Sequence, residues 1–272
     1  MRWTDISSDP NSPEAISYRA KQVSRAAAMF PTTRNDLVAN LVRGKAVLDI
    51  GCVDHDFDLA DKSTWLHGII ARSARYVLGV DYDDAGIQKM RDAGYNVTQV
   101  DITRDMAAVA KEGPFDIIVA GEIIEHVRSP QAVLDLAPHL LTPQGQMLIT
   151  TPNPYALWRV RNGQHGRSFE NVDHVVYCFP AGIAEMADRA GMTLVQYGSV
   201  DDTRRKSLRR MTRVWLGAKR RRIRLGPWWP SLLDLIVMRV RGGFMLGETA
   251  VYLLEVQKEQ EPMWNLGNSF PV

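Results

Sequence analysis

Short apolar runs alternate with helical stretches through the first half of the chain. Five of these runs are rich in β-branched residues and are long enough for buried strands; they cover residues 46–50, 76–81, 95–101, 115–121 and 145–151. Because each run is followed by a helical pattern, the connections should be right-handed crossovers. The sequence therefore predicts an α/β fold with a mostly parallel sheet that is covered on both faces.

Further elements frame this alternation. They are two amino-terminal helices, one later helix and two late strands, predicted over 11–30, 34–42, 180–191, 192–200 and 248–257. Ser12 can cap the first helix and Pro13 suits its first position. A long excursion separates the two late strands, which we expect to pair as an antiparallel hairpin at the sheet edge.

These elements give an expected domain organisation. It comprises an amino-terminal helical cap, a ligand-binding core, a basic Trp-rich insertion, a final edge strand and a loose or surface-packed tail, at 1–43, 44–200, 201–246, 247–258 and 259–272. The chain has 272 residues, of which 45% are hydrophobic and 24% charged, which is typical of a soluble globular protein. The sequence shows neither a long apolar span nor a secretory signal, so we expect a cytoplasmic location with both cysteines reduced.

The positive charge of the chain is concentrated in residues 201–246. This segment holds 13 Lys and Arg against 3 Asp and Glu, and three of the seven tryptophans. Tryptophan combined with arginine is typical of a membrane interface, so contact with the inner face of a membrane or with a lipid-linked ligand is one interpretation. A lid or a homodimer contact is another, and nucleic acid is a less favoured third.

The turn after the first strand indicates the kind of ligand. Gly51 follows that strand, but the turn continues as Cys52-Val53-Asp54-His55-Asp56 and lacks the glycines that let backbone amides approach a pyrophosphate. Carboxylates would repel a phosphate and would attract a cationic ligand such as the ammonium and sulfonium of S-adenosylmethionine. We therefore expect Asp49 and Asp54 to face the ammonium, although Asp54, Asp56 and Asp58 could instead cap a helix.

The next two strands also end in acids. Asp81 ends the second strand, where a carboxylate can accept hydrogen bonds from both ribose hydroxyls, and Tyr82 offers a flat face to adenine. Asp101 and Ile102 follow the third strand, where the carboxylate can take the adenine amino group.

The motifs "VLDIGC", "LGVD", "VTQVDI", "FDIIVAGEIIEHV" and "LTPQGQMLITTPNPY" occur in an order that resembles the class I S-adenosylmethionine-dependent methyltransferases, in particular the quinone-, sugar- and small-molecule O-methyltransferases. The resemblance covers roughly residues 40–200 and implies a Rossmann-like methyltransferase fold with a seven-stranded sheet. It implies S-adenosylmethionine as cofactor and S-adenosylhomocysteine as product. The cofactor contacts that it implies are Asp49, Gly51, Cys52, Asp81, Tyr82, Asp101, Ile102, Gly121 and Glu122.

The chain departs from the family pattern at two places. Val53 and His55 replace glycines of the first turn, and the segment from Asp49 to Asp81 is longer than usual, which indicates a lengthened helix around "STWLHGIIARSA". We expect the amino-terminal helices to close over the cofactor.

The segment "GEIIEHV" is expected to bring acid and histidine side chains, which can transfer protons, to the mouth of this pocket. Methyl transfer from a sulfonium is an in-line displacement, and a hydroxyl acceptor benefits from a base, for which His126 is the first candidate. Glu122, Glu125 and His126 could hold Mg²⁺ weakly, but cofactor binding and helix capping explain them more simply, so no metal is expected. His126 could also be a structural cap.

The region after the fifth strand is expected to roof the acceptor pocket. Asn153, Tyr155, Asp173 and Tyr177 are candidate substrate contacts, and His174 is a second catalytic candidate that could instead pin the loop to the sheet. The expected activity is O-methylation of a small-molecule, sugar or lipid-linked acceptor. RNA methylation and a degenerate cofactor-binding scaffold are the alternatives.

Overall fold

The computed structural model describes residues 2–30, 32–54, 64–102, 104, 107–168, 170–200 and 247–257. Its centre is a seven-stranded sheet with the order β3-β2-β1-β4-β5-β7-β6. The strands are β1 Ala46–Ile50, β2 Tyr76–Asp81, β3 Val97–Gln99, β4 Phe115–Gly121, β5 Leu141–Pro152, β6 Met192–Val200 and β7 Thr249–Val256. Neighbouring strands from β3 to β5 are parallel, whereas β7 is antiparallel to both β5 and β6. The predicted α/β class and the antiparallel hairpin at the sheet edge are confirmed.

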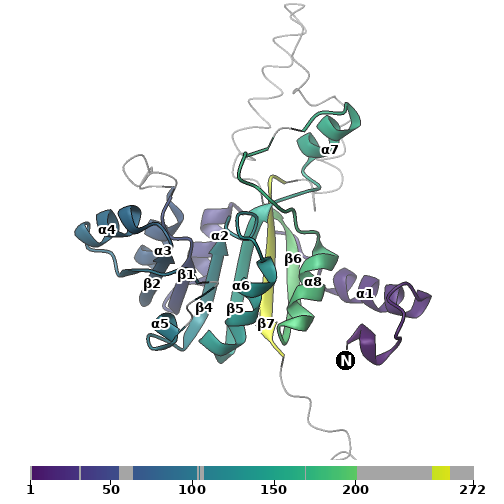
Figure 1. The fold of residues 1–272 in the computed structure, drawn as a ribbon, viewed down its shortest axis with the longest axis horizontal. Helices are drawn as coiled ribbons and strands as arrows, with labels where there is room; N and C mark the ends of the chain where they lie inside the picture. The colour runs from purple at the N-terminus through teal and green to yellow at the C-terminus, as the bar shows by residue number, and fades with distance from the viewer. Residues whose placement is uncertain are drawn as a thin grey trace, which may run out of the picture.

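Helices cover both faces of the sheet (Figure 1). They are the 3₁₀ turn Trp3–Asp5 and the α-helices α1 Pro13–Ala26, α2 Arg34–Leu41, α3 Leu66–Ser73, α4 Asp84–Asp92, α5 Ala107–Ala110, α6 Pro130–Leu140, α7 Leu157–Gln164 and α8 Pro180–Arg189. The hydroxyl of Ser12 accepts a hydrogen bond from the Ala15 amide, which confirms the predicted start of α1. Ser129 and the first-turn Pro130 begin α6 in the same way.

Alternate residues of the strands point to opposite faces, and each face has its own hydrophobic core. Leu48 and Ile118 belong to the larger cluster, with apolar residues of α6 and α8. Val47 and Ile117, one position earlier on the same strands, pack with α2 and α3 in the second cluster. This parity places the side chain of Asp49 on the α3 side of the sheet.

The last strand is not the edge strand that the sequence led us to expect for residues 247–258. β7 lies between β5 and β6, so the edge of the sheet is β6. Seven register pairs join β7 to β5, from Gln146–Glu255 to Pro152–Thr249. The last strand in sequence, β7, is therefore an interior strand that joins β6 to the rest of the sheet.

The two amino-terminal helices have different places. Helix α1 packs against α8 and β6, far from the first strands, and the Ala28 amide donates to the Tyr197 carbonyl at 2.8 Å. Only α2 reaches the carboxyl ends of the strands, where it contacts α3. The expectation that both helices close over the cofactor is wrong for α1, because its Arg19 pairs with Asp188 at 3.0 Å and with Glu185 on α8.

The basic insertion 201–246 and the residues from 258 onward lie outside the described part of the chain, as do residues 55–63 with His55, Asp56 and Asp58. Among the described helices, none combines the length and apolar character needed to cross a bilayer.

Candidate active site

A cavity of about 840 Å³ lies at the carboxyl ends of β1, β2 and β4. Ligands of open α/β sheets bind at this end, near the point where the strand order reverses, and here β1 lies between β2 and β4. The starts of α2 and α3 and the segment at residues 173–174 supply the rest of the wall. Seven of the described wall residues are acids, namely Asp49, Asp54, Asp81, Asp83, Glu122, Glu125 and Asp173.

The turn after β1 keeps a tight shape although it has one glycine. Gly51 has φ +78°, and a Cβ there would lie 2.9 Å from Ile123 Cδ1, so both its backbone and its surroundings favour glycine. Val53, which replaces a family glycine, turns its side chain toward Gly86 of α4, where a Cβ would lie only 2.4 Å from Val53 Cγ1. The missing side chain of Gly86 therefore makes room for Val53.

Asp81 organises the same turn. Its Oδ2 accepts from the Val53 amide and its Oδ1 accepts from the Asp83 amide, both at 3.0 Å. Burial raises the pKa of Asp81, while the hydrogen bonds from Asp83 and Val53 act in the opposite direction. Tyr82, next to it, is 74% exposed, so a flat ring stands at the rim of the cavity.

Asp49 is buried and paired with a histidine that the sequence did not single out. Its Oδ2 lies 2.8 Å from His67 Nδ1, and both side chains line the cavity. Burial, followed by the negative charges of Asp49 and Asp81, raises the pKa of the Cys52 thiol between them. The part of the cavity lined by Asp49, Asp54, Asp81 and Asp83, which we call the cofactor half, is therefore rich in carboxylates, and these favour a cationic ligand.

Arg34 and Glu122 form an ion pair on the cavity wall. Arg34, in the first turn of α2, is the only lysine or arginine among the described wall residues, and its Nη1 lies 3.7 Å from Glu122 Oε1. Glu122 has φ +55°, which is costly for a side chain with a Cβ, and its amide donates to the Thr150 carbonyl at 2.8 Å. Such strain is common at functional sites.

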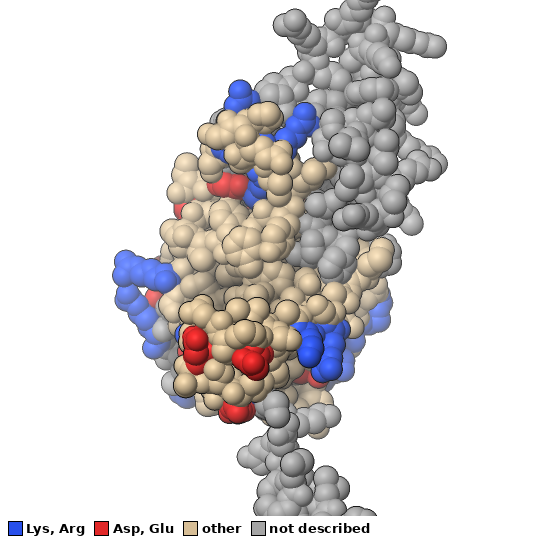
Figure 2. Space-filling model, turned by 90° about the vertical axis from the view of Figure 1, so that its right-hand side faces the viewer, with Lys and Arg blue, Asp and Glu red and all other residues tan. Residues whose placement is uncertain are grey.

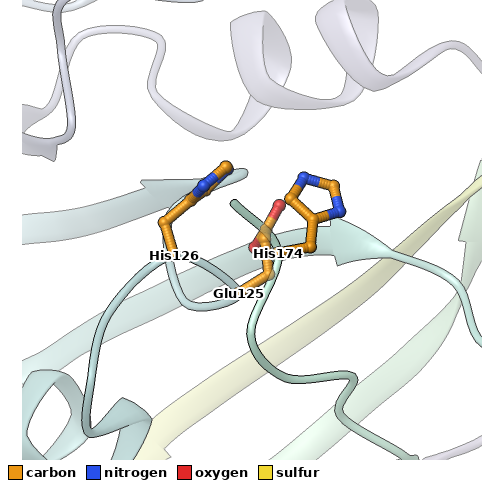
Figure 3. Close-up of side chains that lie close together, drawn as sticks. All are labelled: Glu125, His126 and His174. Carbon is orange, nitrogen blue, oxygen red and sulfur yellow. The ribbon is translucent and has the colours of Figure 1, made fainter. Parts of the chain in front are cut away.

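The other half of the cavity gathers Glu125, His126 and His174. Figure 3 shows that Glu125 and His126 come from the segment after β4 and His174 from a separate loop. Their candidate ligand atoms lie within 4.8 Å of one another, and the two imidazoles meet edge to face with centroids 4.7 Å apart. Carboxylate and imidazole can accept protons and can also bind divalent cations.

Each of these groups has a partner that sets its state. His126 Nδ1 lies 3.0 Å from Asp173 Oδ2, so Asp173 orients His126 and not its neighbour His174. Burial, followed by Glu122, raises the pKa of Glu125 to about 8, and Thr151 Oγ1 donates to Glu125 Oε2 at 2.9 Å. Burial, followed by His126, lowers the pKa of His174, which keeps that imidazole neutral near pH 7.

A second row of polar groups stands behind His174. Its Nδ1 lies 3.2 Å from the Tyr177 hydroxyl, and burial, followed by a hydrogen bond to Glu170, raises the pKa of Tyr177 to about 12. Glu170 forms a two-pronged ion pair with Arg159 on α7, at 2.7 and 3.0 Å. Tyr177 therefore supports His174 from behind and is not part of the described cavity wall.

Most of the predicted site residues meet in this cavity. Those on the described wall are Asp49, Gly51, Cys52, Asp54, Asp81, Tyr82, Gly121, Glu122, His126, Asp173 and His174. The sequence did not single out Arg34, Trp65 or His67, which also lie there. Arg34 begins a predicted helix, and its positive charge could have marked it as a partner for the acids of the pocket. Trp65 and His67 lie in a mostly apolar predicted helix, where the sequence does not distinguish them from core residues.

Besides Tyr177, four predicted contacts lie away from the described cavity wall. Asp101 is exposed and pairs with Arg104 at 3.3 Å, and Ile102 is buried in the larger core cluster. Asn153 is fully buried, and its amide donates to the Gly247 carbonyl at 2.7 Å, which ties β5 to the start of β7. Tyr155 packs edge to face on Phe179, 5.2 Å away, so both aromatics belong to an outer surface.

Comparison with known proteins identifies the family of the chain. A family model described as a methyltransferase domain matches residues 19–197. The chain is a member of this family, the class I S-adenosylmethionine-dependent methyltransferases, whose cofactor is S-adenosylmethionine.

The chain is also similar to individual methyltransferases. The chain is 26% identical over 169 residues to the ubiquinone biosynthesis O-methyltransferase of Neisseria meningitidis serogroup C, and 31% identical over 114 residues to that of Pseudomonas aeruginosa strain LESB58. The matches cover 56% and 40% of this chain, and 65% and 45% of those relatives. The structure of the CcbJ methyltransferase from Streptomyces caelestis aligns with 82% of this chain and 93% of its own at a TM-score of 0.47 and 15% identity.

Proposed function

We propose that the protein transfers a methyl group from S-adenosylmethionine to a hydroxyl of a small-molecule, sugar or lipid-linked acceptor. The observation that carries the proposal is the pairing of an acid-lined cofactor half with a histidine-rich acceptor half in one cavity. Relatives that are O-methyltransferases support the hydroxyl acceptor. The closely packed first turn, with Val53 seated on Gly86, argues against a degenerate scaffold.

The cofactor half has a group for each part of the ligand. Asp49 accepts from the ammonium, Asp81 accepts from the ribose hydroxyls and Tyr82 offers its ring to adenine. Arg34 supplies the positive charge for the carboxylate. When bound, S-adenosylmethionine supplies an electrophilic methyl group that reacts by in-line displacement.

The acceptor half moves the proton. His126, held through Nδ1 by Asp173, accepts the acceptor's hydroxyl proton at Nε2 while the oxygen–methyl bond forms. The bound cofactor would supply the methyl group and would keep the electron pair of the broken carbon–sulfur bond on sulfur, so no further acid or base is needed at that atom. His174 packs against His126 and limits the positions that its ring can take.

Calorimetric titration tests the cofactor assignment. We expect S-adenosylmethionine and S-adenosylhomocysteine to bind, and Asp81→Ala to weaken both by about 2 kcal/mol because two hydrogen bonds to a carboxylate are lost. Asp84→Ala, an exposed neighbour that is not on the described cavity wall, is the control. Tight binding of a dinucleotide in their place would overturn the assignment.

Turnover of two variants tests the base. His126→Gln should lower kcat about 10²-fold or more while the affinity for S-adenosylhomocysteine stays the same, because the base acts only in the transfer step. Asp173→Asn should also lower kcat, since the ring of His126 is then less well oriented. His165→Gln, in an exposed loop position, is the control. Full turnover by His126→Gln, measured against a panel of phenols and sugars, would contradict the role.

An apolar or lipid-linked acceptor has support from the acceptor side of the molecule. Val172, Val175 and Phe179 are exposed near His174, and the basic Trp-rich segment 201–246 joins the described chain at the ends of β6 and β7. We include in the proposal contact between this segment and an anionic membrane surface. Described acidic and basic side chains are mixed on the face shown in Figure 2, so the proposed membrane contact rests on the composition of 201–246, and RNA is the alternative partner of that segment.

A further inference from the structure

Asp49 and His67 form a buried polar pair beside the cavity. The Asp49 side chain is 2% exposed and that of His67 is fully buried, with 2.8 Å between Oδ2 and Nδ1. Asp49 belongs to β1 and His67 to the first turn of α3, so the contact joins strand and helix. Because a carboxylate only accepts, the Nδ1 proton of the ring must point to Asp49.

The absence of a side chain at Gly79 of β2 leaves space for the His67 ring against the sheet. Gly79 of β2 is the register partner of Asp49, and a Cβ on Gly79 would lie 2.7 Å from His67 Cε1. The rings of Trp65 and Tyr95 flank the imidazole, with centroids 5.3 and 5.5 Å away. Strand, helix and aromatic neighbours therefore fix the ring from several sides.

The Asp49–His67 pair destabilises the fold relative to apolar side chains of the same size, so packing alone does not explain it. Nε2 of His67 is buried and has no hydrogen-bond partner among the described residues, and a buried polar atom in that condition destabilises a fold. A leucine would fill similar space without this cost. A buried imidazole that meets a cavity carboxylate through Nδ1 therefore indicates a role in the site.

We propose that His67 is a positioning residue for the amino-acid end of the cofactor and that it acts through Asp49. Its hydrogen bond to Oδ2 fixes the plane of the carboxylate, so that Asp49 meets the ligand's ammonium in one orientation. The inference rests on the proposed function, because it assumes that the cavity takes a sulfonium nucleoside with an α-amino group.

A pair of ligands separates this role from a structural one. S-adenosylhomocysteine and 5′-methylthioadenosine share the nucleoside and a thioether, but only the first has the amino-acid end. We expect His67→Leu to weaken S-adenosylhomocysteine about tenfold or more and to leave 5′-methylthioadenosine unchanged, as measured by calorimetry. His67→Asn, whose amide nitrogen can take the place of Nδ1, should recover most of the lost affinity. His139→Leu, at an exposed position of α6, is the control.

Gly79→Ala provides a second variant that keeps the histidine. Its new Cβ would lie 2.7 Å from the ring, closer than to Cys52 Sγ and Val97 Cγ1 at 2.9 Å each. Displacement of the ring should then give the same selective loss for S-adenosylhomocysteine even if His67→Leu fails to fold. Equal weakening of both ligands, or no change for S-adenosylhomocysteine, would overturn the inference. Failure of the wild-type chain to bind either ligand would instead overturn the proposed function, and this inference with it.

Discussion

Glu125 binds a proton that the unfolded chain has lost at neutral pH. The residue is 1% exposed, and burial, followed by Glu122, raises its pKa to about 8 from an ordinary value of 4.5. Between these pH values the folded chain holds more protons than the unfolded chain, so the free energy of unfolding falls as the pH rises. The stabilisation is complete below pH 4.5 and is lost above pH 8.

Glu125→Gln should remove this dependence while its side-chain oxygen still accepts from Thr151. We expect the variant to gain stability relative to the wild type by about 1 kcal/mol for each pH unit across the window, measured by urea denaturation. Glu14→Gln, an exposed position in α1, serves as control. Parallel curves for Glu125→Gln and the wild type would show that the carboxyl ionises normally.

Single residues were predictable where the reason is local. Gly51 directly follows β1 and Asp81 is the last residue of β2, so the ends of the predicted strands already indicate that both residues lie at the pocket. The partnership of Asp173 with His126 was not visible, because it joins two segments through the fold while the sequence shows Asp173 beside His174. His67 was missed for a related reason, since an apolar helix pattern does not reveal which carboxylate the helix meets.

At the level of elements, the turn after β1 packs on α4 through Val53, which stands where the family has a glycine, and through Gly86. Gly86→Ala should clash with Val53 and destabilise the fold by about 1 to 3 kcal/mol. Val53→Gly in the same chain should restore part of that loss, since it removes the side chain that the new methyl meets. Thermal unfolding of both single variants and the double variant measures the coupling. Additive losses would mean that the two residues do not compete for space.

The strands were well predicted because buried β-branched runs have a clear beginning and end. β1, β2, β4 and β6 have the expected bounds, while β3 is shorter and β5 longer than expected. The position of α1 could not be predicted, since its amphipathic pattern shows that one side is buried but not against what. In the fold, Gly198 leaves room for the Ala28 carbonyl, 2.4 Å from where a Cβ would be, which seats the end of α1 on the sheet edge.

For the whole molecule, the described residues that flank the basic segment 201–246 lie close together. Val200 is the register partner of Thr249, and the Gly247 amide donates to Ser199 Oγ at 3.1 Å. Replacing residues 201–246 with a short Gly-Ser linker should therefore leave the sheet closed. We expect an unchanged melting temperature and unchanged affinity for S-adenosylhomocysteine.

The same deletion tests the proposed membrane contact. The full chain should pellet with anionic liposomes at low salt and the shortened chain should not, because the removed residues hold 13 Lys and Arg against 3 Asp and Glu and the remaining residues have more acids than bases. Pelleting of the full chain with RNA but not with liposomes would favour the nucleic-acid alternative. A shortened chain that unfolds would mean that the segment belongs to the core.

The interior position of β7 affects how the protein emerges from the ribosome. Until residues 249–256 leave the exit tunnel, β5 has an unpaired edge and β6 cannot join the rest of the sheet. During synthesis of the residues between β6 and β7, the nascent chain therefore has β5 and β6 with unpaired edges. In this period chaperones can bind those edges and incorrect strand pairs can form. Mutations in these eight residues should lower yield in cells more than they lower the activity of the molecules that do fold.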